Sequence, residues 1–273
     1  MSFTPKLTVC IPCFNEERFI GKAIESVLLQ TYKAFTLQVV DDCSIDGSLG
    51  IIRTFRDPRI EVHRSSKNLG LYENLNRCLQ LARTPYVKIV CADDVLDPTC
   101  LEEELAVLEK YPKLVLSFCS SIVIDADGRR LLKRRLYPQS LQIDGGKLIR
   151  VILASARNPI GEPTGVMFRK RSVDAYHLRL RSDEYRHMAD LEFWIQLLEH
   201  GDGYYLDRKL FSFRLHPGAG TVGLLKRSVA EHRKLLREYE MRYPLTIVQR
   251  VLFHGRLIGF FLGKMAFVRL FAR

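Results

Sequence analysis

The stretch LTVCIPCFNEE at residues 7–17 opens with a short run of apolar and β-branched residues and ends in polar ones. The same pattern returns at residues 37–42, 60–63 and 86–94, and helix-like segments separate the repeats. Short apolar runs are typical of buried strands, and their alternation with helices is typical of parallel strands joined by crossover helices. The sequence therefore predicts an α/β fold with an open, mostly parallel, twisted sheet flanked by helices.

The same reasoning predicts the bounds of the elements. Strands are expected at Leu7–Ile11, Leu37–Val40, Ile60–His63, Tyr86–Val90, Leu114–Ile124, Thr164–Phe168 and Leu210–Leu215. Helices are expected at Ile20–Gln30, Ser48–Phe55, Leu71–Ala82, Pro98–Tyr111, Gly146–Ala154 and Ala189–His200. The Asp-Gly pair at residues 127–128 predicts a turn.

These elements indicate one large α/β domain with an appendage, which a chain of 273 residues can hold. The turn-forming run at residues 217–220 closes the domain. We place the domain at residues 1–223 and a helical extension at residues 224–273. The extension is expected to form two helices, Leu224–Arg242 and Leu245–Arg273, hinged at Pro244.

The composition excludes several classes of protein. A hydrophobic content of 47% and a charged content of 27% suit a globular domain, not a disordered or collagen-like chain. The net charge of +11 suits a polyanionic partner, which leaves nucleic acid, an anionic bilayer and a nucleotide diphosphate open. We find no signal-like segment and no uncharged apolar run of the roughly 18 residues that a membrane span requires. The expected location is the cytoplasm.

All seven cysteines lie in the first half of the chain, mostly inside apolar runs. An odd number in such positions favours free thiols in a reducing compartment. Cys10 and Cys13 form one Cys-x-x-Cys pair, but no second pair or histidine cluster completes a zinc site. A structural role is therefore predicted for these two thiols.

Two pairs of carboxylates follow predicted strands. Asp41 and Asp42 end the second strand, and Asp93 and Asp94 follow the fourth. In open α/β sheets ligands bind at the carboxyl ends of the strands, where a carboxylate can meet a base or a ribose. Clustered carboxylates beside a diphosphate suggest a hard divalent cation between them. A solvated helix-capping turn is the alternative for the first pair.

Four motifs together resemble glycosyltransferase family 2, whose fold is called GT-A. They are VCIPCFNEE at 9–17, VDDCSIDGS at 40–48, NLG at 68–70, and ADD at 92–94 followed by Asp97-Pro98. In order and spacing they cover roughly the first hundred residues. Each motif alone is weak, but the set is specific.

The resemblance implies roles for these residues. Pro12, Phe14 and Glu16 would line the nucleotide pocket, and Asp41, with Asp42 beside it, would contact the base. Asp93 would ligate a Mn or Mg ion that bridges the donor diphosphate, and Asp94 would support it. On this basis residues 1–97 form a nucleotide-binding half and residues 98–223 an acceptor-side half.

One residue departs from the family pattern. The family's Asp-x-Asp element usually begins with an aspartate where this chain has Cys91. We expect a structural role for Cys91, with a soft metal contact as the alternative. The missing carboxylate also keeps open a rival interpretation, in which the chain is a catalytically silent nucleotide-binding or scaffold protein at the membrane.

The second half supplies a candidate base and candidate phosphate ligands. Asp190, in the segment MADLEFW at 188–194, resembles the family's general base, although aspartate is also a good N-cap. Glu192 is the fallback base, but helical geometry turns it to another face. Arg214 and His216 resemble the family's phosphate-closing segment and alternate as on a strand, so both could meet one diphosphate. A solvated surface strand is the bland alternative.

The extension after Pro244 carries five basic residues and no acidic one, with phenylalanines between the charges. This pattern is typical of an interfacial helix, and it predicts contact with an anionic membrane surface on the inner face of the cell membrane. The alternative is a helix packed on the domain's own core. Charges interrupt every stretch long enough for a full span.

The predicted function is therefore an inverting, metal-dependent glycosyltransferase that uses a nucleotide diphosphate sugar, with a UDP-sugar as first choice. The acceptor would be a glycan or glycolipid in cell-surface polysaccharide assembly, a setting implied by the resemblance alone. Nucleotidyltransferases are disfavoured because no glycine-rich basic loop follows the first strand. The chain lacks the Gly-x-Gly-x-x-Gly motif of dehydrogenases after a strand, and it contains no recognised nucleic-acid-binding module.

Overall fold

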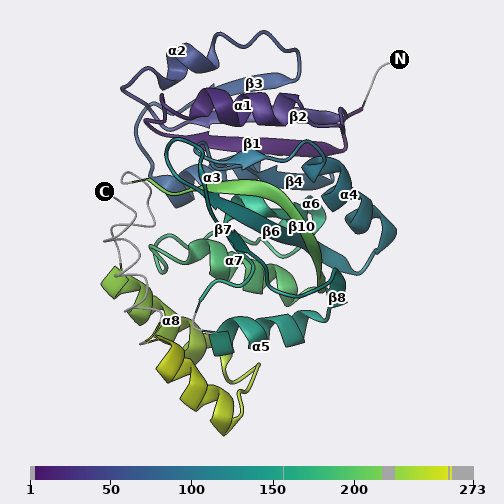
Figure 1. Cartoon of the computed structure of the whole chain (residues 1–273), viewed down its shortest axis with the longest axis vertical. Coiled ribbons are helices and arrows are strands. Elements are labelled where there is room, and N and C mark those ends of the chain that lie inside the picture. The colour runs from purple at the N-terminus through teal and green to yellow at the C-terminus, as the bar shows by residue number, and fades with distance from the viewer. Residues whose placement is uncertain (1–3, 156, 217–224, 258, 260–273) are drawn as a thin grey trace.

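The computed structural model describes residues 4–155, 157–216, 225–257 and 259. Its strands form one sheet in the order β3-β2-β1-β4-β9-β6-β10-β5, with β7 beside β6 and β8 beside β10 (Figure 1). Their bounds are β1 (Leu7–Cys13), β2 (Phe35–Asp41), β3 (Ile60–Arg64), β4 (Tyr86–Ile89), β5 (Val95–Leu96), β6 (Leu114–Ile124), β7 (Arg130–Arg134), β8 (Leu141–Ile143), β9 (Val166–Arg169) and β10 (Asp202–Arg214).

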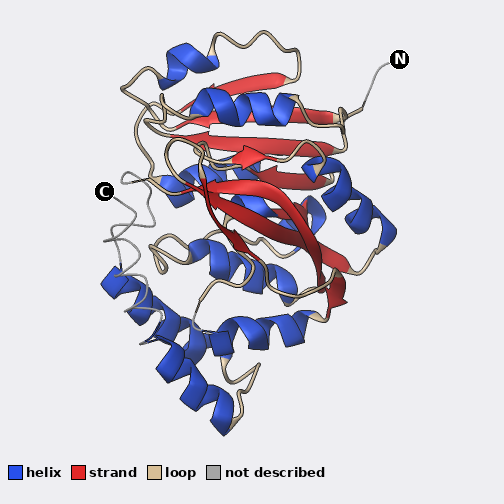
Figure 2. Cartoon of the chain, in the orientation of Figure 1, coloured by secondary structure: helices blue, strands red, loops and turns tan. Residues whose placement is uncertain are grey.

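Helices cover the sheet on both faces (Figure 2). They are α1 (Ile20–Leu28), α2 (Ser48–Ile52), α3 (Leu71–Leu81), α4 (Cys100–Lys110), α5 (Gly145–Ser155), α6 (Lys170–Ala175), α7 (Ala189–Leu198) and α8 (Leu225–Tyr239), with a 3₁₀ turn at Pro163–Gly165. Residues of α1 and α4 belong to one hydrophobic core. Residues of α3, α5, α7 and α8 belong to a second core.

The side chains of β1 explain why its sequence is apolar without a break. Val9 and Ile11 enter the core with α1, while Cys10 between them enters the core with α3. A strand buried on both faces needs apolar residues at every position, as parallel strands under crossover helices do. β1 pairs in parallel with β2 and β4, and β2 pairs in parallel with β3. The predicted parallel half of an α/β sheet is thus confirmed.

β9 reverses the direction of the sheet twice. It pairs antiparallel with β4 on one side and with β6 on the other. β6 therefore runs in the same direction as β4, and β10 pairs in parallel with β6. The carboxyl ends of β1, β2, β4 and β10 consequently meet at one edge of the sheet, and this edge carries the candidate site.

The second half of the chain departs from the predicted bounds. β10 begins at Asp202 instead of residue 210, because irregular pairing with β6 between Leu206 and Lys209 interrupts the alternation on which the prediction rested. The predicted strand at 164–168 begins as a 3₁₀ turn and continues as β9. Short elements such as β5, β7, β8 and α6 were not predicted, because so few residues carry no readable period.

The C-terminal extension packs on the domain up to residue 257. After α8, a further helix spans residues 247–257, in which Phe253 and Leu257 are buried. Both join the core that contains α7, so the packing alternative is correct for this part. The predicted loop at 217–220 and most of the predicted helix beyond 257 lie outside the described residues. In the part of the chain that the structure describes, no helix has the length and apolarity to cross a membrane.

Candidate active site

The loop after β4 places Asp93 at the centre of an ionisable cluster. Asp93 Oδ2 lies 3.1 Å from Nε2 of His216, which follows β10. Glu16, which follows β1, belongs to the same cluster. The pKa of Glu16 is raised to about 7, mainly by burial and then by the negative charge of Asp93, while His216 opposes the rise. Three residues predicted from separate motifs therefore meet at the edge formed by the ends of β1, β4 and β10.

Asp94 and Arg214 hold the acidic loop in shape. Asp94 is buried, and its two oxygens accept hydrogen bonds from the Arg214 backbone N–H at 2.9 Å and the Thr164 hydroxyl at 2.5 Å. Arg214, only 2% exposed, donates from Nε to the carbonyl of Asp93 at 2.8 Å and from Nη1 to the carbonyls of residues 125–126. Direct contacts of Asp94 with a metal and of Arg214 with phosphate stay predictions.

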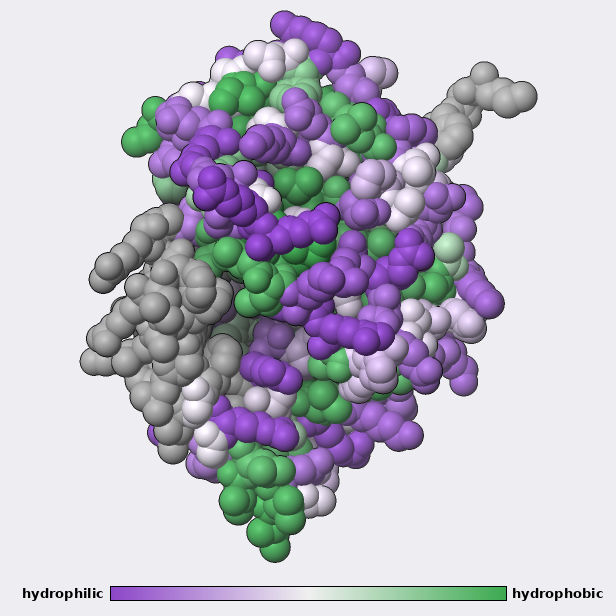
Figure 3. All heavy atoms as spheres, viewed as in Figure 1, coloured by the Kyte–Doolittle hydropathy of each residue, from purple (hydrophilic) through white to green (hydrophobic). Residues whose placement is uncertain are grey.

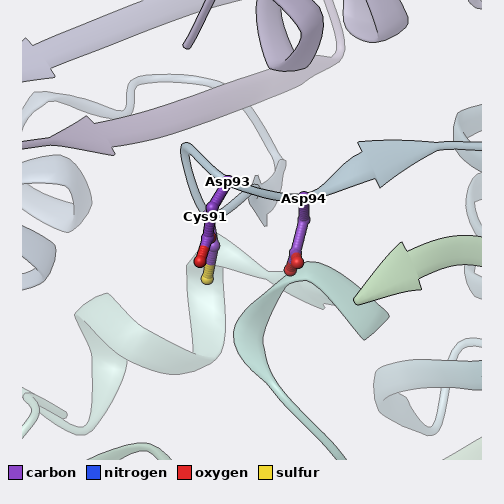
Figure 4. Close-up of side chains that lie close together, drawn as sticks. All are labelled: Cys91, Asp93 and Asp94. Atoms are coloured by element: carbon purple, nitrogen blue, oxygen red, sulfur yellow. The ribbon is translucent and has the colours of Figure 1, made fainter. Parts of the chain in front are cut away.

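Cys91, Asp93 and Asp94 form a candidate cation site (Figure 4). One ligand atom from each lies within 4.8 Å of the others. Burial raises the pKa of Cys91 well above its usual value, and the charges of Asp94 and Asp93 raise it further, so the thiol stays protonated. Both oxygens of Asp94 are already engaged. The donor set therefore fits a hard divalent cation held mainly through Asp93.

The two aspartates that end β2 have different surroundings. Both oxygens of Asp42, which is buried, accept backbone N–H groups of Leu69 and Gly70 at 2.9–3.0 Å, so Asp42 holds the NLG loop at residues 68–70. Asp41 is also buried, and its Oδ2 lies 3.2 Å from Nε of Arg64. Arg64 and Cys43 line a shallow depression of about 440 Å³ beside it. Arg64, the ion-pair partner of Asp41, therefore connects this aspartate with the depression.

The first two motifs are tied together by side chain to backbone hydrogen bonds. Asn15 has a left-handed backbone with φ of 55°, which asparagine tolerates better than most residues. Its N–H donates to Ser44 Oγ at 3.0 Å, and its Oδ1 accepts the N–H of Ile45 at 2.9 Å. These bonds fix the segment between Pro12, which is buried in β1, and Glu16, and they leave Phe14 42% exposed.

Asp190 lies in the first turn of α7. The N-cap of this helix is Met188, so the N-cap interpretation of Asp190 is wrong. Asn158 Nδ2 donates to Asp190 Oδ2 at 3.4 Å. The pKa of Asp190 is raised to about 7; burial is the main cause, backbone N–H groups of the helix start oppose the rise, and the charge of Glu162 adds to it. A carboxylate with a pKa near 7 is suited to general base catalysis at neutral pH.

Glu192 has a structural environment. It is fully buried, lies 2.8 Å from Nη2 of Arg181, and accepts the hydroxyl of Tyr239 at 2.6 Å. Tyr239 belongs to α8, so Glu192 joins α7 to the extension. The predicted turn of Glu192 to another face than Asp190 agrees with these contacts, and they leave Asp190 as the candidate base.

Three residues near the site, Thr164, Glu162 and Arg134, were given no role by sequence reasoning. Thr164 donates to Asp94 and accepts the backbone N–H of Cys91 at 2.9 Å. Glu162 accepts hydrogen bonds from both terminal guanidinium nitrogens of Arg134, from Nη1 at 2.7 Å and from Nη2 at 2.6 Å. The Gly-Glu-Pro-Thr-Gly run at 161–165 marks a loop, but its pattern does not show which strand end the loop reaches.

Comparisons with known proteins agree with this fold. The family model of glycosyl transferase family 2 matches residues 8–176, more than half of the chain. The chain therefore belongs to glycosyl transferase family 2, and its α/β sheet is that of the GT-A glycosyltransferases. Among relatives, TuaG of Bacillus subtilis, assigned to teichuronic acid biosynthesis, is 27% identical over 78% of this chain and 81% of its own length.

Two solved glycosyltransferases share the fold. TarS of Staphylococcus aureus superposes with a TM-score of 0.70 at 18% identity, over 92% of this chain and 70% of the TarS chain, and it has also been solved with UDP and with UDP-GlcNAc. A mannosyltransferase from Pyrobaculum calidifontis, solved with GDP-Man and Mn²⁺, superposes with a TM-score of 0.62 at 16% identity, over the whole of this chain and 77% of its own.

Proposed function

We propose that this glycosyltransferase moves a sugar from a UDP-sugar to an acceptor hydroxyl with inversion, using a divalent cation at Asp93. One observation carries the proposal. The loop before β9 contacts both the candidate base and the acidic loop, because Asn158 donates to Asp190 Oδ2 at 3.4 Å and Thr164 donates to Asp94 Oδ2 at 2.5 Å. The acidic loop and the candidate base therefore share one site, as transfer from a diphosphate donor requires.

In this mechanism the acceptor oxygen attacks the anomeric carbon from the side opposite the diphosphate. Asp190 accepts the hydroxyl proton, the new C–O bond forms, and the bond to the diphosphate oxygen breaks with its electron pair. A divalent cation, when bound, would offset the charge that develops on the leaving diphosphate. Asp93 would hold it, and Arg214 and Asp94 keep the Asp93 loop in place. His216 lies beside Asp93, where a phosphate oxygen could meet it.

The donor base is proposed as uracil because the solved TarS complexes contain UDP and UDP-GlcNAc. A thermal-shift panel of uridine, guanosine and thymidine diphosphate sugars, each with and without Mn²⁺, tests this directly. The true donor at 100 times its Kd should add about 2.7 kcal/mol of stability. A larger shift with a guanosine or thymidine donor would overturn the choice of uracil. If the chain binds a donor but transfers its sugar to no acceptor, the silent-binding interpretation replaces catalysis.

Replacing Asp93 by asparagine should abolish the dependence of UDP binding on Mn²⁺, because the variant loses the accessible carboxylate of the candidate cation site. Calorimetric titration of UDP into wild type and variant, with Mn²⁺ and with chelator, measures this. Asp127→Asn is the matched control, since Asp127 is an exposed acid near the same edge, paired with Arg18 at 3.0 Å. If wild type and Asp93→Asn bind UDP with the same affinity, both with Mn²⁺ and with chelator, the proposed metal site is wrong.

The acceptor is proposed to be a glycan or glycolipid of the cell surface, met at the inner face of the cell membrane. TuaG's assignment to teichuronic acid biosynthesis supports the setting. The exposed face of the helix at residues 247–257 supports the membrane contact. Ile247, Val248, Val251 and Leu252 are exposed there, at 82%, 66%, 67% and 45%. In Figure 3 hydrophobic residues gather at the lower tip of the molecule, where Figure 1 shows the yellow helix that follows α8.

The apolar face supports membrane contact more strongly than the charges do within the described residues. Arg250 pairs with Glu240 at 2.7 Å, and Arg256 donates to the carbonyl of Ala154 at 3.3 Å. Each further basic residue near an anionic surface would add about 1 kcal/mol. Salt should therefore weaken binding without abolishing it, since apolar burial is insensitive to screening.

Replacing both Ile247 and Val251 by serine should strongly reduce co-sedimentation with phosphatidylglycerol-containing vesicles, because the exposed apolar face loses two of its side chains. Both residues are exposed, so the fold should not change. Leu29→Ser is the matched control: Leu29 is 71% exposed, but it lies at the end of α1. Undiminished sedimentation of the double variant would mean that this face does not bind the bilayer.

A further inference from the structure

Glu231, in the first half of α8, reaches across to the segment that precedes the candidate base. Its Oε1 accepts the backbone N–H of Arg186 at 3.0 Å. Its Oε2 accepts the backbone N–H groups of His187 at 2.9 Å and Met188 at 3.1 Å. One carboxylate thus fixes three consecutive peptide groups, and the last of them is the N-cap of α7.

The start of α7 has no cap of its own. Met188 offers no side-chain hydrogen bond to the helix, and Asp190 lies two residues beyond it. The hydrogen bond from Asn158 is long, at 3.4 Å, so it restrains the carboxylate of Asp190 weakly. The path of the backbone before Asp190 therefore depends on an acceptor supplied by α8.

α8 is a firm support for this acceptor. Leu235, Leu236 and Tyr239 are buried in the core that contains α7. Glu238, two turns beyond Glu231, lies 2.5 Å from Nη2 of Arg181 and accepts the hydroxyl of Tyr185 at 2.7 Å. Arg181 and Tyr185 precede the segment that Glu231 holds, and the Tyr239 hydroxyl donates to Glu192 beyond it at 2.6 Å, so α8 is tied to both sides of this segment. α8 lies beyond the part of the chain that the family model matches.

We propose that Glu231 is a positioning residue, which sets the place of the Asp190 carboxylate relative to the acceptor hydroxyl. The inference rests on the proposed role of Asp190 as general base. It makes α8 a part of the catalytic domain, and not the first element of a separate extension. A displacement of about 1 Å in a reacting group can cost about 100-fold in rate, so three backbone hydrogen bonds are enough to control the chemistry.

Glu231 also contributes to the electrostatic surroundings of Asp190. The ionisable groups that face Asp190 are Glu162 from the loop before β9, Glu231 from α8 and Tyr72 from α3. After burial, the charges of Glu162 and Glu231 raise the pKa of Asp190 further. Removal of the Glu231 charge should therefore lower the pKa of Asp190. A loss of packing alone would not produce this shift, so the pKa distinguishes the two roles.

The experiment compares Glu231→Gln, Glu231→Ala and Glu238→Gln in the full chain. For Glu231→Ala we expect kcat to fall by about 100-fold, with the KM and the calorimetric Kd of the donor unchanged. Glu231→Gln keeps one carbonyl acceptor and should lose less. In both, the acid limb of the pH profile of transfer should move to lower pH. Glu238→Gln breaks contacts of the same helix and should leave the limb where it is.

The outcomes separate this inference from the proposed function. If Glu231→Ala keeps the wild-type kcat while Asp190→Asn loses transfer strongly, the positioning role of Glu231 is wrong and the role of Asp190 as base stands. Wild-type transfer by Asp190→Asn would overturn the base on which the inference rests. If Glu231→Gln and Glu238→Gln lose kcat equally and neither shifts the acid limb, Glu231 only stabilises the fold. Donor calorimetry on each variant shows that the protein is folded.

Discussion

Asp190→Asn should lower the rate of sugar transfer by about 100-fold or more, which corresponds to about 3 kcal/mol of transition-state stabilisation. Asparagine keeps the size of the side chain but cannot accept the acceptor's proton. Within the described residues, no hydrogen bond joins Asp190 to the acidic loop after β4. The Kd of the donor should therefore stay within a few-fold of wild type. Initial rates with saturating donor, together with calorimetry, measure both quantities.

The pH dependence of wild type gives a second measure of the same group. Asp190 must be ionised to act as a base, and its pKa is about 7. Below pH 7, kcat/KM should therefore fall about tenfold per pH unit, and it should level off above that pH. An acid limb near pH 4, the usual value for an exposed aspartate, would mean that another group is the base.

The stability of Asp190→Asn separates catalysis from folding. A carboxyl whose folded pKa lies above its unfolded pKa binds more protons when folded, so stability falls as pH rises between about 4 and 7. At pH 8 the ionised Asp190 therefore destabilises the fold, and asparagine should relieve this cost. The melting temperature of the variant at pH 8 should equal or exceed that of wild type. A large decrease would mean that the lost activity reflects lost structure.

Glu192→Gln is a less clean control than the sequence suggests. Sequence reasoning predicts that it affects transfer far less than Asp190→Asn. The buried contact of Glu192 with Arg181, however, makes it a residue of the core. We expect the variant to be less stable and to retain transfer at temperatures where it is folded. Loss of transfer in folded protein would bring Glu192 back as a candidate base.

Lys88→Met should destabilise the protein by about 3–5 kcal/mol, because it leaves the Glu104 carboxylate buried without its cation. Lys88 in β4 and Glu104 in α4 form an ion pair whose side chains are both fully buried. Cys100 also donates to Glu104, at 3.5 Å, but a thiol cannot replace an ammonium group. Denaturant unfolding followed by circular dichroism measures the change in free energy.

The double variant Lys88→Met with Glu104→Leu tests the cause. Replacing a buried ion pair by apolar residues of similar volume is often neutral, so the second substitution should restore most of the lost stability. Lys6→Met is the exposed control, since Lys6 pairs with Glu109 at 2.8 Å at the surface, and this substitution should destabilise the protein far less than Lys88→Met. A double variant as unstable as Lys88→Met would show that packing, and not the unpaired charge, dominates.

The first half of the fold could be predicted from the sequence because local pattern and tertiary role agree there. The apolar run of β1 is continuous since both of its faces are buried, and the polar residues that follow each strand mark the binding edge. β9 could not be placed in the same way. Nothing in residues 166–169 indicates that they insert antiparallel between β4 and β6, because such pairing joins segments about 80 residues apart in sequence.

The site was predicted in its residue types more fully than in its contacts. Asp93, Glu16 and His216 meet, although their motifs lie far apart in the chain. For Arg214 the alternation of side chains predicted a phosphate contact shared with His216, and this contact stays a prediction. The alternation could not indicate that the guanidinium donates to backbone carbonyls of the Asp93 loop and of residues 125–126. Any residue can accept a hydrogen bond through its backbone carbonyl, so the sequence does not show which residues Arg214 contacts in this way.

The two cores are completed at different moments of synthesis. Among the described residues, the last buried member of the core around α1 and α4 is Phe211, whereas the core around α7 includes Phe253 and Leu257. A ribosome that adds about 5–20 residues per second needs several seconds for the interval. During that time the core around α1 and α4 can pack, while Trp194 and its neighbours in the other core are not yet covered by α8. A nascent chain arrested there would leave the apolar side chains of the core around α7 without the cover of α8 and of the helix at residues 247–257.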